Sequence, residues 1–109
     1  MDWGIEIPTF GVLADPVAAT AVAQAADNLG FDSIWVADHI VFPPVIESRY
    51  PYSDDGIFVA PADAPFLDPL VALSYLAALT SRCRLGLSVL ILPYRNPILT
   101  AMMGASLDQ

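Results

Sequence analysis

Residues 84–92 read Arg-Leu-Gly-Leu-Ser-Val-Leu-Ile-Leu, a run that is apolar almost throughout. A strand with one solvated face alternates polar and apolar residues, whereas a parallel strand covered on both faces is apolar along its length. The run therefore predicts a buried parallel strand. Two shorter apolar runs with β-branched residues, at 3–8 and 33–37, predict further strands of the same sheet.

Helices are predicted in the segments between and after these strands. Two Asp-Pro pairs, at 15–16 and 68–69, each place a capping aspartate before a proline at the first helical position. After the first pair, apolar residues repeat at helical spacing up to a glycine, which predicts a helix over 16–29 with a left-handed C-cap. The second pair predicts a helix over about 70–80, and a third helix is expected over 98–107.

The order strand–helix–strand–helix–strand–helix predicts an α/β fold with parallel strands joined by right-handed crossovers. A doubly wound sheet would carry a glycine-rich phosphate turn after its first strand, but residues 8–11 read Pro-Thr-Phe-Gly and do not match that pattern. The alternative, a TIM (β/α)8 barrel, takes about 250 residues. Residues 1–109 are therefore expected to be the first three β/α units of a truncated barrel domain, with a long proline-rich loop at 40–67 inside it.

The charge of the chain excludes several classes of partner. Its formal net charge is −8 and its four basic residues are all arginine, so there is no basic stripe for nucleic acid or for an anionic membrane surface. The longest stretch without a charged residue, 69–81, is shorter than the roughly 20 residues that cross a bilayer. The single cysteine, Cys83, excludes an internal disulfide, and with one histidine in the chain no structural zinc site is expected. A cytoplasmic protein without a metal is expected.

Candidate functional residues follow the predicted strands, because ligands of such folds bind at the C-terminal strand ends. Asp38 and His39 directly follow the second strand, and His39 is the only histidine. A histidine there can act as a general acid or base near pH 7; the alternative is that it only hydrogen-bonds a neighbouring carbonyl. Ser88 interrupts the third apolar run, either at a functional position or to bond the adjacent backbone. Arg95 and Asn96 can touch an anion, but between two prolines they are more typical of a turn.

Three stretches of the sequence resemble luciferase-like monooxygenases. Residues 30–39 (Gly-Phe-Asp-Ser-Ile-Trp-Val-Ala-Asp-His) are similar to the second-strand signature of that family. Residues 66–73 (Phe-Leu-Asp-Pro-Leu-Val-Ala-Leu) and 84–97, which continue the third strand into Pro-Tyr-Arg-Asn-Pro, strengthen the match. The similarity is greatest to the branch that uses the deazaflavin coenzyme F420. It implies that the full-length protein is a TIM barrel and a homodimer or larger assembly.

The resemblance also implies roles for individual residues. His39 would be the active-site histidine beside the reactive ring carbon of the coenzyme, and Asp38 would contact the ring system. Ser88 and Val89 would form a bulge that supports one face of the ring, with a cis peptide bond between them in the cofactor-bound protein. Two further residues would line the same pocket: Leu90 and Ile91.

The implied function is that of an oxidoreductase that transfers hydride with coenzyme F420 on a small organic substrate of unknown identity. Two alternatives stay open: a monooxygenase that uses reduced FMN and molecular oxygen, and an inactive truncated fragment or binding remnant. In the family, the phosphate-binding residues lie in later strands. The isolated 109 residues are therefore expected to be inactive.

Overall fold

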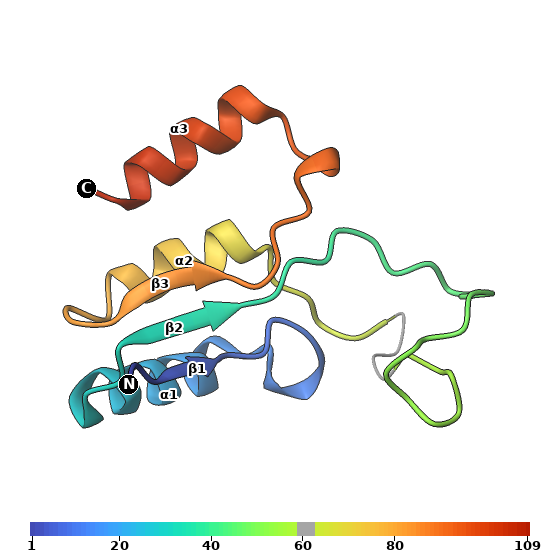
Figure 1. The fold of residues 1–109 in the computed structure, drawn as a ribbon, viewed down its shortest axis with the longest axis horizontal. Helices are drawn as coiled ribbons and strands as arrows, with labels where there is room; N and C mark the ends of the chain where they lie inside the picture. Colours follow the sequence, from blue (N-terminus) through green and yellow to red (C-terminus); the bar gives the residue numbers. More distant parts are fainter. Residues whose placement is uncertain (59–62) are drawn as a thin grey trace.

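Three parallel strands form the sheet, in the order β1-β2-β3. The structure, a computed structural model, describes residues 1–58 and 63–109 (Figure 1). Strands and helices alternate along the chain, which confirms the predicted α/β fold and is consistent with the N-terminal portion of a TIM barrel. The elements are β1 (Gly4–Glu6), the 3-10 turn η1 (Gly11–Leu13), α1 (Pro16–Leu29), β2 (Ser33–Val36), α2 (Pro69–Ala77), β3 (Arg84–Leu87), the 3-10 turn η2 (Leu92–Tyr94) and α3 (Pro97–Leu107).

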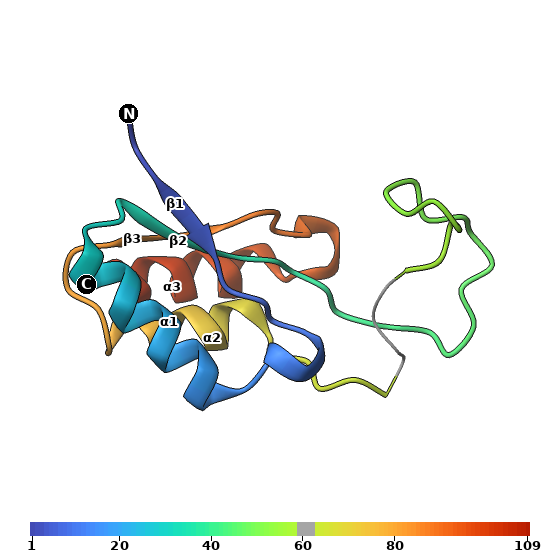
Figure 2. The ribbon, with the colours of Figure 1, turned by 90° about the horizontal axis from the view of Figure 1, so that it is seen from below.

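All three helices lie on one side of the sheet, which we call the helix face; the opposite side is the open face (Figure 2). Alanines spaced at three and four residues along α1 bring that helix close to the sheet, because a methyl group takes little room. Leucines of α2 and β-branched residues of β2 fill the remaining space. The buried core consists of Ile7, Ala19, Ala23, Ala26, Ile34, Val36, Leu73 and Leu76.

The boundaries of α1 match the predicted range exactly at both ends. The Asp15 side chain accepts a hydrogen bond from the Ala18 amide at 2.9 Å and so caps the first turn. Gly30 ends the helix with a φ of 83°, in the left-handed region that favours glycine. An aspartate cap like that of α1 begins α2, at Asp68. This helix ends at Ala77 rather than near residue 80, the end predicted from the sequence.

One tryptophan lies across two glycines on the open face. The strand register places Glu6, Trp35 and Gly86 side by side. A Cβ atom on Gly86 would come within 2.5 Å of a carbon of the indole ring, and a Cβ atom on Gly4 within 2.8 Å of the indole nitrogen. A side chain at either glycine would therefore force the indole ring, or Ser33 beside Gly4, to shift.

The third strand is shorter and less covered than the sequence predicts. It ends at Leu87 instead of Leu92, and the Ser88–Val89 peptide bond is cis, as the family resemblance implies for the cofactor-bound protein. Residues of β3 are half-buried or exposed rather than buried on both faces. The physical reason is that, within residues 1–58 and 63–109, no helix covers the open face (Figure 2).

A buried carboxylate fixes the N-terminal end of β3. Asp27, in the last turns of α1, accepts hydrogen bonds from the backbone amides of Cys83, Arg82 and Ser81 at 2.8, 2.9 and 3.1 Å. These bonds, with that of the Cys83 amide the strongest, lower the pKa of Asp27 to about 2. The turn that enters β3 is therefore attached to α1.

The proline-rich segment after β2 projects beyond the C-terminal ends of the strands (Figures 1 and 2). Within residues 40–58 and 63–67, an isolated bridge between Phe66 and Phe10 is the only regular pairing. The amide of Leu67 also donates to the carbonyl of Thr9 at 2.8 Å. The end of the segment is thereby held beside the chain that leaves β1.

Candidate functional site

The C-terminal ends of β2 and β3 are joined by two hydrogen bonds. The Ser88 amide donates to the Val36 carbonyl at 2.9 Å, and the Ile91 amide donates to Asp38 Oδ2 at 3.0 Å. Because His39 follows Asp38 directly, these bonds bring the predicted site residues of both strands to one rim of the sheet. We call residues 36–39 and 88–91 the strand-end rim.

Asp38 lies at the centre of the rim, with its side chain fully buried. Its carboxylate accepts from Arg95 through two parallel hydrogen bonds, Nε to Oδ2 at 2.9 Å and Nη2 to Oδ1 at 2.8 Å. The Arg95 hydrogen bonds, followed by that of the Ile91 amide, hold the pKa of Asp38 below its usual range. In this arrangement the carboxylate is ionised and already engaged by protein groups. Direct contact of Asp38 with a cofactor ring remains a prediction.

Arg95 also belongs to the site. From the sequence alone it could either bind an anion or be part of a turn, and its role stayed open. The structure places it against Asp38, 57 residues away in sequence, and its side chain is only 11% exposed. A signal was available: a carboxylate directly after a buried strand needs a positive partner, and the chain has only four basic residues. Asn96, by contrast, caps α3 by accepting from the Ile98 and Leu99 amides.

His39 is half-buried and lies among phenylalanine rings. The centroid of its ring is 5.2 Å from that of Phe42 and 5.6 Å from that of Phe10. Phe58 and Phe66, from the proline-rich segment, lie at 5.5 and 5.9 Å. The imidazole therefore has an apolar surrounding built from the segments that follow β1 and β2, and these segments limit the approach of water.

The four predicted rim residues after β3 differ in exposure. Val89 is 67% exposed and Ser88 is also exposed, whereas Leu90 and Ile91 are half-buried. Ser88 also borders a hollow on the open face, together with Gly4, Ile5, Glu6 and Trp35. Glu6 adds a carboxylate to that hollow, which sequence reasoning missed because a single acidic residue in a short strand gives no pattern.

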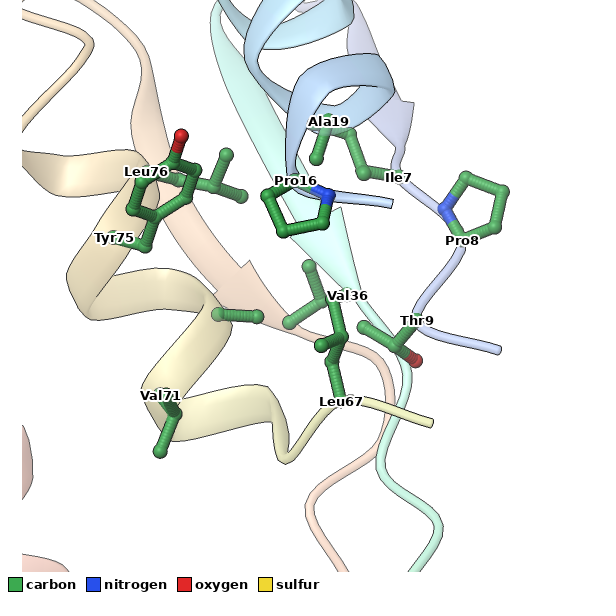
Figure 3. A pocket seen from close by; sticks show the side chains of 11 residues that line it. Ile7, Pro8, Thr9, Pro16, Ala19, Val36, Leu67, Val71, Tyr75 and Leu76 are labelled. Atoms are coloured by element: carbon green, nitrogen blue, oxygen red, sulfur yellow. The ribbon is translucent and has the colours of Figure 1, made fainter. Parts of the chain in front are cut away.

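A second pocket lies on the helix face between α1 and α2, with a volume of about 240 Å³ (Figure 3). The hydroxyl of Tyr75 at its margin is hydrogen-bonded to Thr20 Oγ1 at 2.7 Å. Apart from Thr9 and Tyr75 the lining side chains are apolar, and none is an acid, an imidazole or a cation, so the pocket offers no group for acid–base chemistry. Its residues are Ile7, Pro8, Thr9, Pro16, Ala19, Val36, Leu67, Val71, Ala72, Tyr75 and Leu76.

Cys83 lies away from the strand-end rim, at the start of β3. Its thiol donates to the Phe31 carbonyl at 3.1 Å, and burial, with the nearby Asp27, raises the pKa of the thiol. Cys83 therefore packs at the start of β3 and lies outside the candidate site. In the part of the chain that the structure describes, no three His, Cys, Asp or Glu side chains gather to form a metal site. None of the described helices is long and apolar enough to cross a membrane.

Comparison with known proteins gives the family. The sequence profile of luciferase-like monooxygenases matches residues 7–109, nearly the whole chain. The chain belongs to the luciferase-like monooxygenase family. Members of this family are flavin- or F420-dependent oxidoreductases.

Two proteins that are similar to this chain come from Mycobacterium tuberculosis (strain H37Rv). One uncharacterized protein is 37% identical over 86 residues, which is 79% of this chain and 30% of the relative. A second uncharacterized protein is 30% identical over 92 residues, which is 84% of this chain and 33% of the relative. The chain thus spans about a third of the length of these relatives.

Proposed function

We propose that this chain supplies the ring-binding end of the cofactor pocket in an oxidoreductase that uses coenzyme F420 to transfer hydride to or from a small organic substrate. One observation carries the proposal: residues 88–91 are hydrogen-bonded to Val36 and Asp38 at the strand end that His39 directly follows, in a chain that matches the family over residues 7–109. The full-length protein is proposed to be a cytoplasmic homodimer, on the basis of the family resemblance.

The rim fits the ring part of such a cofactor. The faces of a deazaflavin ring are flat and can stack on apolar side chains, and the exposed Val89 offers such a surface. The half-buried Leu90 and Ile91 extend that surface.

The arginines of the chain do not fit the phosphate part. Arg95 is paired with carboxylates. Arg84 lies at the end of β3 opposite to the rim and pairs with Asp2. Arg82 precedes that strand, and Arg49 lies in the proline-rich segment. We therefore assign the phosphate-binding residues to the two thirds of the relatives that this chain does not cover.

His39 would move a proton at the rim. When bound, the deazaflavin supplies hydride transfer at a carbon of its central ring. An imidazole nitrogen of His39 would donate or accept the proton that accompanies this transfer, and the surrounding phenylalanines would exclude water from it. Ser88 and Val89 would orient the ring by supporting one of its faces.

The cofactor can be tested directly on the full-length protein that carries this chain. We would titrate it separately with F420 and with FMN and follow the absorbance and fluorescence of each. We expect F420 to bind and FMN to bind at least tenfold more weakly. Tighter binding of reduced FMN, with oxygen consumption, would favour the monooxygenase instead, and binding of neither cofactor would favour an inactive remnant.

The role of His39 is tested by His39→Ala. We expect turnover with F420 to fall by roughly 10²- to 10⁴-fold, the usual contribution of a general acid or base, while the Kd for F420 changes little. Gln24→Ala, on the exposed side of α1, is the control and should leave both quantities unchanged. A loss of turnover below about threefold would limit His39 to a structural role.

A further inference from the structure

Arg95 joins the end of a strand to the start of a helix. Besides its two hydrogen bonds to Asp38, its Nη2 donates to Asp68 Oδ2 at 2.9 Å. The other oxygen of Asp68 accepts from the Leu70 and Val71 amides and caps α2. A single guanidinium thus holds the C-terminal end of β2 and the N-terminal end of α2 together.

The same network holds the segment that follows β3. The segment is attached to β2 at both of its ends, by the Ser88 amide at Val36 and by the Ile91 amide at Asp38. The second attachment exists only while the Asp38 carboxylate keeps its present orientation, and that orientation is fixed by the two parallel hydrogen bonds from Arg95. Paired bonds of this kind restrict geometry more than a single point charge does.

Loss of Arg95 would release the segment. Asp38 would become a buried carboxylate without a counter-ion, a state that a protein avoids by protonating the group or by turning it toward water. Either response weakens or removes the acceptor of the Ile91 amide. The exposed Val89, two residues before Ile91, would then lose its fixed position relative to His39.

We propose that Arg95 is a positioning residue of the strand-end rim: through Asp38 and Asp68 it sets the place of residues 88–91 relative to His39. Only the expected effect on the binding of a planar cofactor rests on the proposed function. The positioning itself is a property of the chain. It gives Asp38 the role of holding the rim together.

The test compares Arg95→Lys with a matched control in the full-length protein. Lysine keeps the positive charge but cannot make the two parallel hydrogen bonds. Asp68→Asn is the milder second variant, because asparagine still caps α2 but offers Arg95 no charge. Asp27→Asn is the control: it removes the charge of another buried carboxylate that accepts backbone amides at β3, at the end of the strand opposite to the rim.

The first measurement is hydrogen exchange of a peptide covering residues 88–92. We expect exchange to rise in Arg95→Lys and, less strongly, in Asp68→Asn, and to stay at the wild-type level in Asp27→Asn. This measurement needs no cofactor. Unchanged exchange in both Arg95→Lys and Asp68→Asn would overturn the proposal, even if the protein binds F420 as proposed.

The second measurement is the Kd for F420 and for a deazaflavin that lacks the phosphate tail. A misplaced rim should weaken both ligands by about the same factor, roughly tenfold or more, because the ring of each ligand loses the same preorganised contacts. Asp27→Asn should change both Kd values less than about twofold. Weakening of F420 alone would show that Arg95 binds the phosphate and would overturn the positioning role. If wild type binds neither ligand, the proposed function fails, and the exchange measurement decides this inference by itself.

Discussion

Gly86→Ala should destabilise the protein, although alanine normally suits a strand better than glycine does. The new Cβ atom would lie 2.5 and 2.6 Å from two carbons of the Trp35 ring. Carbon atoms pack at about 3.5–4.0 Å, so the ring or the strand must shift by roughly 1 Å. Overpacking of this kind costs about 1–3 kcal/mol, and the reduced entropy of the unfolded chain offsets about 0.4–1 kcal/mol of it. At the middle of these ranges we expect a net loss of about 1.3 kcal/mol.

The assay is urea denaturation followed by far-ultraviolet circular dichroism, in wild type and in a Trp35→Ala background. Without the indole ring the clash is absent, so Gly86→Ala should become neutral or stabilising. Gly104→Ala in α3 is the control, since a Cβ atom there meets nothing within 4 Å. It should stabilise by up to about 1 kcal/mol. If Gly86→Ala has the same effect in both backgrounds, to within about 0.5 kcal/mol, the packing argument for Trp35 is wrong.

Three further predictions concern the helices and the turn before β3. Because the pKa of Asp27 is lowered to about 2, its ionisation stabilises the fold above its unfolded pKa of about 3.9, and this contribution is lost as the pH falls through about 2. Asp27→Asn should therefore make the urea midpoint fall less steeply between pH 4 and pH 2; an unchanged slope would contradict the assigned hydrogen bonds. Leu73→Ala removes a core side chain that is 2% exposed and should cost about 2–5 kcal/mol in the same assay; a cost under 1 kcal/mol would mean that the core collapses around the cavity. Asp15→Ala should cost about 1 kcal/mol through the lost α1 cap, whereas Asp15→Ser should retain most of it; equal losses would show that the cap does not depend on a side-chain acceptor.

Much of the fold could be predicted because its signals are local. The aspartate, proline and glycine that bound α1 act within a few residues of their own position, so the sequence fixes both ends of the helix. The end of β3 could not be predicted in the same way. Apolar residues continue to Leu92, but the chain leaves the sheet after Leu87. A pattern of hydrophobicity does not distinguish an extended apolar strand from an apolar turn, since both place apolar side chains next to one another.

The candidate site was predictable only in part, for a related reason. His39 was singled out because it follows an apolar strand, and Ser88 because it is a polar residue that interrupts one. The pairing of Arg95 with Asp38 spans 57 residues. The sequence indicates that the strand-end carboxylate needs a cation, but not which of the four arginines supplies it. The rings around His39 likewise come from segments whose return to the sheet depends on backbone contacts, such as that between Leu67 and Thr9.

Asp68 is partly exposed, yet its two hydrogen-bonding roles restrict which residues suit the position, as packing does for a residue of the buried core. Its side chain is 43% exposed, yet one oxygen caps α2 and the other accepts from Arg95. Serine and threonine can cap but carry no charge, and asparagine can cap but turns an amide N–H toward the guanidinium. Glutamate keeps the charge, but its additional methylene moves the oxygens away from the helix amides. In saturation mutagenesis, aspartate should be the most stabilising residue at position 68, so that exposure by itself would misjudge its mutational tolerance.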